Sequence, residues 1–191
     1  MISNVSENPL WIKQIETRTI LRDINTEHWL QNNLFSIAWW VALILVIFIW
    51  YFWWKKVDKT RLLEIVAYGL MFAIVATVMD LFGAELVLWG YPNMLIPLMP
   101  PLFTADFSVL PVTFMLVYQY FSNWKSFAIA TLITSFILSF IEEPIAVWFE
   151  FYQLNNWKHL YSLPIYIVLA LSLKWVMNKI IAKQNSSRCK Q

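Results

Sequence analysis

Long apolar stretches separated by short polar ones make up most of the chain after residue 33. The first stretch, residues 34–54, holds one aliphatic polar side chain, Ser36, and ends at Lys55 and Lys56. An α-helix needs about 20 apolar residues to cross a bilayer, because every backbone N–H and C=O must be bonded inside the segment. Residues 34–54 are therefore predicted to form a transmembrane helix.

Four further apolar stretches follow the first one. They cover residues 62–82, 105–121, 127–148 and 163–181. The five stretches predict an all-α fold, an integral membrane bundle of about five transmembrane helices. This transmembrane domain is expected to cover residues 34–182.

Basic residues near the ends of these stretches predict how the bundle is oriented. Short cytoplasmic loops of membrane proteins are enriched in Lys and Arg. One side of a five-helix arrangement holds Lys55, Lys56, Lys59, Arg61, Lys125, Lys174, Lys179, Lys183, Arg188 and Lys190. The opposite loops, residues 83–104 and 149–162, carry only Lys158. The N-terminus is therefore predicted outside, and the C-terminus inside with residues 183–191 as a basic cytoplasmic tail.

Residues 1–33 have a different pattern, in which apolar and charged residues mix. Apolar positions and one threonine recur at steps of three and four at Trp11, Ile12, Ile15, Thr19, Ile20 and Ile24. Such spacing is typical of an amphipathic helix. We expect an extramembrane N-terminal segment that lies on the membrane surface or packs on the loops of its own bundle.

The predicted loop between the second and third spans is unusually rich in proline. Residues 91–103 contain Pro92, Pro97, Pro100 and Pro101. Proline lacks a backbone N–H and breaks helices, so a regular helix across this loop is excluded. Because the loop is apolar, we expect it to dip into the membrane interface or to cap the bundle.

Composition excludes several classes of protein. The chain has 60% hydrophobic and 14% charged residues and a mean hydropathy of +0.57, which is too apolar for a soluble domain of 191 residues. Its net charge of +2 gives no sign of nucleic-acid binding. The single cysteine has no intramolecular partner. His28 and His159 are interpreted as surface groups, and we expect neither a metal nor a cofactor. The predicted location is the cell membrane.

Acidic residues inside the apolar stretches are the candidate chemistry. Asp80 lies near the outer end of the second span, Asp106 begins the third, and Glu142 with Glu143 lies about six residues inside the outer end of the fourth. Carboxyl groups at membrane depth cost free energy and often mark functional sites. Asp80, Glu142 and Glu143 are therefore candidate catalytic acids. The candidate substrate-binding residues around them are Glu85, Trp89, Tyr91, Asp106, Trp157 and Tyr161.

The adjacent pair Glu142 and Glu143 has two interpretations. Consecutive helical residues point about 100° apart, so one carboxyl is expected to face the bundle interior and the other a neighbouring helix. Pro144 removes a backbone donor and predicts a kink, which is typical of a cavity wall. Alternatively, both carboxyl groups bind Trp and Tyr donors and only hold helices together.

Three segments of the chain resemble a poorly characterised family of small multi-pass membrane proteins from spore-forming Gram-positive bacteria. They are Asp80 with LWGYPN (Leu88–Asn93), the acid of the fourth span, and NWKHLYSLPIY (Asn156–Tyr166). The resemblance covers about residues 62–180. Its most specific part is the pattern of Trp157, Tyr161, Ser162 and Tyr166. It implies a fold and a location, but no reaction.

A second likeness is to the membrane-embedded lycopene and terpene cyclases, whose spans carry an Asp, then a Gly and Trp-x-Tyr, and later an acidic pair. Residues in this order are Asp80, Gly83, Trp89, Tyr91, Glu142 and Glu143. In those cyclases the acidic pair follows a proline, whereas Pro144 comes after it here. Motifs this short need structural context to carry weight.

Three functions fit these residues. The first is a membrane protein that binds or protonates a small lipophilic molecule with neutral carboxylic acids in an aromatic pocket. The second is a proton- or cation-linked transporter, but the inner halves of the spans hold little polar relay beyond Glu64 and Gln119. The third is a non-catalytic membrane component that binds a partner through its N-terminal segment.

Overall fold

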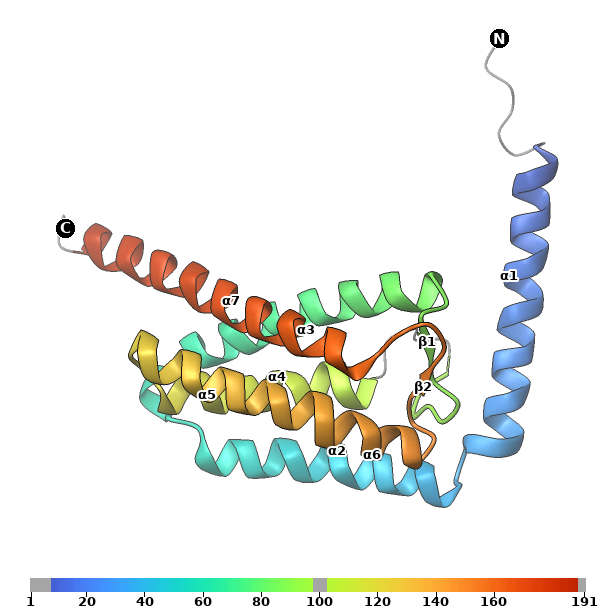
Figure 1. Cartoon of the computed structure of the whole chain (residues 1–191), viewed down its shortest axis with the longest axis horizontal. Helices are drawn as coiled ribbons and strands as arrows, with labels where there is room; N and C mark the ends of the chain where they lie inside the picture. The colour runs from blue at the N-terminus through green and yellow to red at the C-terminus, as the bar shows by residue number, and fades with distance from the viewer. Residues whose placement is uncertain (1–7, 98–102, 189–191) are drawn as a thin grey trace, which may run out of the picture.

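The computed structural model describes residues 8–97 and 103–188, which form a helical bundle with a short two-stranded ribbon at one end (Figure 1). The α-helices are α1 (Pro9–His28), α2 (Ile37–Lys56), α3 (Leu62–Glu85), α4 (Leu110–Tyr120), α5 (Trp124–Ile137), α6 (Glu143–Trp148) and α7 (His159–Arg188). Single turns of π-helix cover Trp29–Asn33, Ala105–Val109 and Leu138–Glu142, and a 3-10 turn covers Lys59–Arg61. Strands β1 (Trp89–Gly90) and β2 (Gln153–Leu154) pair antiparallel.

Four helical segments are long and apolar enough to cross a membrane. They are Ile37–Lys56, Lys59–Glu85, Trp124–Trp148 and His159–Ser187. At most a third of the residues in each apolar window are buried inside the bundle, so most of these apolar side chains face outward. The predicted all-α fold is confirmed, and by length and composition these four segments are those of a membrane protein.

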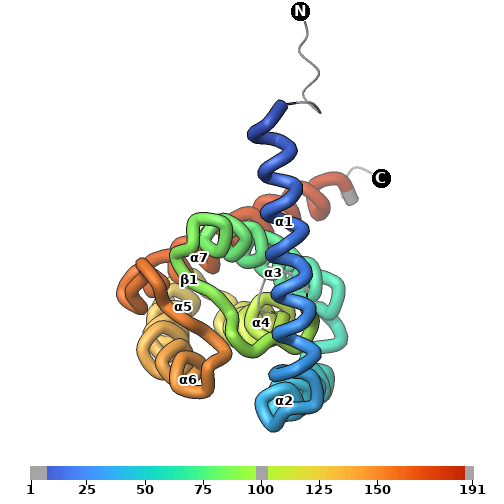
Figure 2. The backbone as a smooth tube through the Cα atoms, turned by 90° about the vertical axis from the view of Figure 1, so that its right-hand side faces the viewer, coloured from blue at the N-terminus to red at the C-terminus, as the bar shows by residue number. Residues whose placement is uncertain are grey.

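The remaining predicted span, residues 105–121, forms a shorter helix in the centre of the bundle. The π turn and α4 together cover residues 105–120, which is about 24 Å of helix. Helix α4 contacts α2, α3 and α5, and Figure 2 shows it enclosed by the other helices. Its buried residues are Leu110, Pro111, Val112, Phe114, Met115, Val117 and Tyr118. Helix α4 is therefore packed mainly against protein, where a full membrane-crossing length is not needed.

Stacked aromatic rings join α3 to α4 in the middle of the bundle. The ring centroids of Phe72 and Phe114 lie 4.5 Å apart, and those of Tyr68 and Tyr118 lie 4.3 Å apart. All four side chains are buried. Each such pair contributes about 0.5–1.5 kcal/mol beyond the area that it buries. These rings fill the space between the two ends of the bundle.

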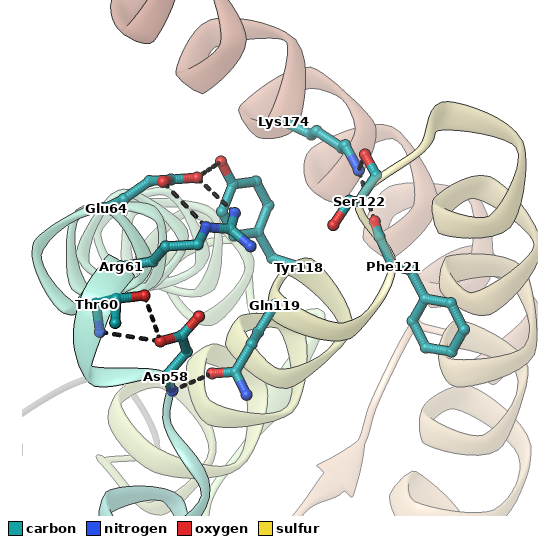
Figure 3. A network of polar contacts seen from close by, with 9 residues as sticks. All are labelled: Asp58, Thr60, Arg61, Glu64, Tyr118, Gln119, Phe121, Ser122 and Lys174. Carbon is teal, nitrogen blue, oxygen red and sulfur yellow. Dashed lines mark hydrogen bonds and ion pairs between the residues drawn. The ribbon is translucent and has the colours of Figure 1, made fainter.

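We call the end of the bundle formed by residues 55–61 and 121–125 the basic end (Figure 3). Arg61 and Tyr118 both bind the Glu64 carboxylate, each at 2.7 Å. Asp58 caps the following turn by accepting from the backbone N–H and the hydroxyl of Thr60. These hydrogen bonds hold the pKa of Asp58 below its usual range.

Lys174 also lies at the basic end, but its side chain is buried. The sequence groups it with the exposed C-terminal basic residues, whereas its side chain is only 2% exposed. Its Nζ donates to the carbonyl oxygens of Phe121 and Ser122, both at 2.8 Å, as Figure 3 shows. The last carbonyls of a helix have no partner within the helix and attract positive charge. Lys174 is buried because it supplies donors where α4 ends.

We call the opposite end, formed by residues 86–97 and 149–158, the ribbon end. Helix α1 stands across this end and none of its residues is buried (Figure 1). The segment that follows α1 is anchored by indole N–H groups: Trp29 donates to the Met94 carbonyl and Trp39 to the Leu95 carbonyl, both at 3.0 Å. The sequence therefore predicts the N-terminal helix correctly, and this helix contacts the ribbon end through Arg18, 3.7 Å from Glu85, and through His28, 3.1 Å from the Pro92 carbonyl. Residues 91–97 of the proline-rich loop contain no helix, and residues 98–102 lie outside the described part.

Candidate functional site

A cavity of about 370 Å³ lies at the ribbon end, between α3, the start of the central helix, α6 and α7. Its lining includes the four carboxyl groups that the sequence singled out within the apolar stretches, Asp80, Asp106, Glu142 and Glu143. The other polar or aromatic lining residues are Phe82, Trp89, Tyr91, Tyr152, Trp157, Ser162 and Tyr166. The remaining walls are aliphatic side chains and glycine. The cavity is thus an apolar, aromatic pocket with four acids.

Asp80 receives donors from the strand that follows α3. Nε1 of Trp89 donates to Oδ1 of Asp80 at 2.7 Å, and the Tyr91 hydroxyl donates to the same oxygen. The chain folds back because α3 ends with Val87 in the left-handed region, at φ 55°, and the Leu88 N–H bonds to the Gly83 carbonyl at 2.9 Å. A left-handed residue commonly ends a helix in this way. The reversal lays Trp89 over the last turn of α3.

Gly83 makes this close approach possible. A Cβ atom at residue 83 would overlap the six-membered ring of the Trp89 indole. Glycine has no side chain, so the ring can lie directly against the helix backbone. Gly83 therefore positions the indole that binds Asp80.

Asp106 joins Asp80 from the central helix. It is buried on the π turn Ala105–Val109, and its carboxyl group is hydrogen-bonded to that of Asp80. A carboxylate has only acceptors, so a hydrogen bond between two carboxyl groups requires a proton on one of them. The pair is thus arranged to hold a proton beside the cavity.

Glu143 forms the second acidic centre, with donors from the start of α7. The Tyr166 hydroxyl donates to Oε1 at 2.9 Å, and Nδ1 of His159 lies 2.8 Å from Oε2. Ser162 also binds this carboxyl group and accepts the Trp157 indole N–H at 3.1 Å. The sequence interprets His159 as a surface group, whereas its ring binds Glu143 and its side chain is 27% exposed. Spacing of three, four and seven residues places His159, Ser162 and Tyr166 on one face of α7.

Glu142 is placed differently from its neighbour. It lines the same cavity, but no hydrogen bond or ion pair is found for its carboxyl group among the described residues. The two carboxyl groups do not share a partner, since only Glu143 is bound to α7, although both residues line the cavity. The π turn Leu138–Glu142 ends at this pair and changes the angle between successive residues. This π turn lies just before Pro144, where the sequence predicts a kink.

Aromatic rings connect the two acidic centres. Trp89 and Trp157 meet edge to face with centroids 4.9 Å apart, and Tyr91 stacks on Tyr152 at 5.9 Å. Burial, and next the charge of Asp80, raise the pKa of Tyr91 far above its usual range. Burial, and next Glu143, do the same for the pKa of Tyr152. Both hydroxyl groups therefore remain protonated and can donate hydrogen bonds.

The cavity reaches the side of the bundle. Phe82 and Leu86 of α3 line it, although each is 68% exposed. Ile165 and Leu169 of α7 line it as well, and α3 packs against α7. Residues that belong both to the lining and to the outer surface mark an opening. This opening lies beside α3, among apolar side chains.

The structure brings together most of the residues that the sequence proposed. Asp80, Asp106, Glu142, Glu143, Trp89, Tyr91 and Trp157 line the cavity. Glu85 does not, because its side chain is 70% exposed and lies 3.7 Å from Arg18. Tyr161 does not line it either, and packs edge to face against Trp157 from outside, at 5.3 Å.

Several lining residues were not proposed as site residues. Tyr152, Ser162 and Tyr166 line the cavity, and His159 binds Glu143. The spacing of His159, Ser162 and Tyr166 on one helix face was a usable signal. Tyr152 is one of the aromatic residues that the sequence places on the same side as the acids, but its position in the lining depends on the turn after α6, where Glu150 has φ 60° and the Tyr152 N–H bonds to the Ala146 carbonyl.

Within the described residues, no group of three or more His, Cys, Asp or Glu side chains is arranged to hold a metal ion. Comparison of the chain with protein-family models, curated proteins and solved structures found no match.

Proposed function

We propose that the chain is a five-span protein of the cell membrane, with the ribbon end outside, whose cavity binds a small lipophilic molecule and supplies it with a proton. One observation carries the proposal: an apolar and aromatic cavity holds four carboxyl groups and opens among exposed apolar side chains of α3. Ligand pockets are typically concave, mostly apolar and provided with a few polar groups. A side opening among apolar residues suits a molecule that arrives from the bilayer.

The acids have separate roles in this proposal. The hydrogen-bonded pair Asp80 and Asp106 holds a proton in an apolar site, where a neutral carboxylic acid is an effective donor. Glu143 is bound by three side chains and shapes the opposite wall. The faces of Trp89 and Trp157 stabilise positive charge that develops on the bound molecule.

The test is a lipid-extract mass spectrum of the purified protein. We expect a co-purifying lipophilic molecule in the wild type and its loss in Ala146→Trp, which fills the cavity from α6. Leu45→Trp is the matched control, because Leu45 is exposed on α2 far from the cavity. A spectrum that shows no bound molecule in the wild type, or the same molecule in Ala146→Trp, would contradict the proposal.

Proton transport is the second candidate, and one feature favours it. Thr131, Ser135 and Ser139 are fully buried on α5 and the following turn, and their hydroxyl groups have no hydrogen-bond partner within the described residues. They stand at four-residue steps in line with Glu143. Each step rises about 6 Å, so water would have to join the hydroxyls. Proton flux in liposomes that disappears in Glu143→Gln, without a bound lipophile, would favour transport.

A further inference from the structure

The charges around the cavity are unbalanced. Four carboxyl groups line it, and no Lys or Arg is among the lining residues in the described part of the chain. His159, a basic side chain beside the cavity, is already bound to Glu143. A ligand with positive charge would therefore complement the cavity better than a neutral or negative ligand.

Only one of the four acids lacks a partner in the described part of the chain. Asp80 and Asp106 bind each other, and Trp89 and Tyr91 also donate to Asp80. Glu143 has its three partners on and around α7. Glu142 lines the cavity with no such bond. A partly buried carboxyl group without a partner is costly, and a bound cation would offset that cost.

The aromatic walls suit the same kind of ligand. Tyr91, Tyr152 and Tyr166 line the cavity beside the two tryptophans Trp89 and Trp157. The faces of aromatic rings attract organic cations, and quaternary ammonium groups are commonly held in cages of such rings. A metal ion would instead need clustered ligands, and the described residues contain no such group.

We infer that the ligand is a lipophilic cation, whose ammonium group lies against the Glu142 carboxylate among the aromatic rings. Its apolar part extends between α3 and α7 toward the bilayer, past Phe82 and Leu86. This inference rests on the binding part of the proposed function and not on the proton transfer, because it uses the same cavity and names the chemical class of its ligand.

The test compares two probes of one shape. Trimethyl(4-phenylbutyl)ammonium is a permanent cation, and its carbon isostere, in which a quaternary carbon replaces the nitrogen, is neutral. Binding to the full chain in phosphatidylcholine nanodiscs is measured through quenching of tryptophan fluorescence, with empty nanodiscs as background. We expect the cation to bind at least about tenfold more tightly than the isostere, since one desolvated ion pair is worth more than 1.4 kcal/mol.

Variants then assign the preference to one carboxyl group. Glu142→Gln should abolish the tenfold preference for the cation over the neutral isostere. Glu150→Gln is the matched control, because Glu150 is an exposed residue of the ribbon end and its loss changes the net charge equally. Glu142→Asp, which keeps the charge, should retain part of the preference.

The outcomes separate this inference from the proposed function. Equal affinity for both probes in the wild-type protein would overturn the cation inference and leave a lipophile-binding cavity. Equal loss of cation binding in Glu142→Gln and Glu150→Gln would also overturn it, because the effect would then be general surface charge. If neither probe binds and no lipophile co-purifies, the proposed function fails as well.

Discussion

Gly83→Ala tests whether the cavity wall is as tightly packed as the structure indicates. The added Cβ would overlap atoms Cε2, Cζ2 and Cη2 of the Trp89 ring. The ring has little space to move, because its Nε1 is bonded to Asp80 at 2.7 Å and it packs edge to face with the Trp157 ring, with centroids 4.9 Å apart. The indole must therefore turn away and give up its hydrogen bond.

The size of the effect follows from three contributions. Leaving a buried donor and acceptor unpaired costs about 1–3 kcal/mol, and overpacking costs about 1–3 kcal/mol. Replacing glycine with alanine within a helix by itself raises the free energy of unfolding by about 1 kcal/mol. When the ring moves, the cost of overpacking falls while the cost of the lost hydrogen bond rises, so the two are not fully additive. We therefore expect Gly83→Ala to lower the free energy of unfolding by about 2–4 kcal/mol.

The assay is unfolding of the purified protein in mixed micelles, followed by tryptophan fluorescence. Gly90→Ala is the matched control, since a Cβ at residue 90 meets no atom within 4 Å, and it should change the free energy of unfolding by less than about 0.5 kcal/mol. In a Trp89→Phe background, whose ring is smaller, the cost of Gly83→Ala should fall by at least half. An equal cost in both backgrounds would refute the reasoning.

Two further predictions concern the rest of the bundle. Lys174→Met leaves two carbonyls at the end of α4 unpaired and should lower the free energy of unfolding by about 2–4 kcal/mol in the same micelle assay. Lys183 is exposed, so Lys183→Met should change this free energy by less than about 0.5 kcal/mol. In a Cys189→Ser background, an impermeant thiol reagent on intact cells should label a cysteine at Asn155 and not one at Lys125; labelling of both would contradict the five-span topology.

The helical type of the apolar segments could be predicted from the sequence, but neither how many of them are long enough to cross a membrane nor which of them is central. Residues 34–54 and 105–121 are both apolar, yet α2 faces outward over most of its surface and α4 is enclosed. Apolar side chains suit lipid and protein interiors equally, so hydropathy does not distinguish the two positions. The burial of Lys174 could not be predicted for a related reason, because its partners are backbone carbonyls that no sequence pattern marks.

The candidate site could be predicted in outline because acids are rare at membrane depth. Asp80, Asp106 and Glu143 were recognisable from their apolar surroundings alone. Glu85 and Tyr161 were included by proximity in sequence, and their exposure depends on helix rotation, which an all-apolar segment does not reveal. The π turns next to Asp106 and Glu142 have no clear sequence signature apart from the prolines that follow them.

The bond between Lys174 and the end of α4 has a consequence for how the protein is made. Lys174 follows Phe121 by 53 residues, so ribosomal synthesis at about 5–20 residues per second delivers it several seconds after α4 is complete. Until then the last carbonyls of α4 lack their native donor. Helix α4 therefore reaches its final state only when α7 joins the bundle. In a chain that ends before residue 174, the end of α4 never receives this donor.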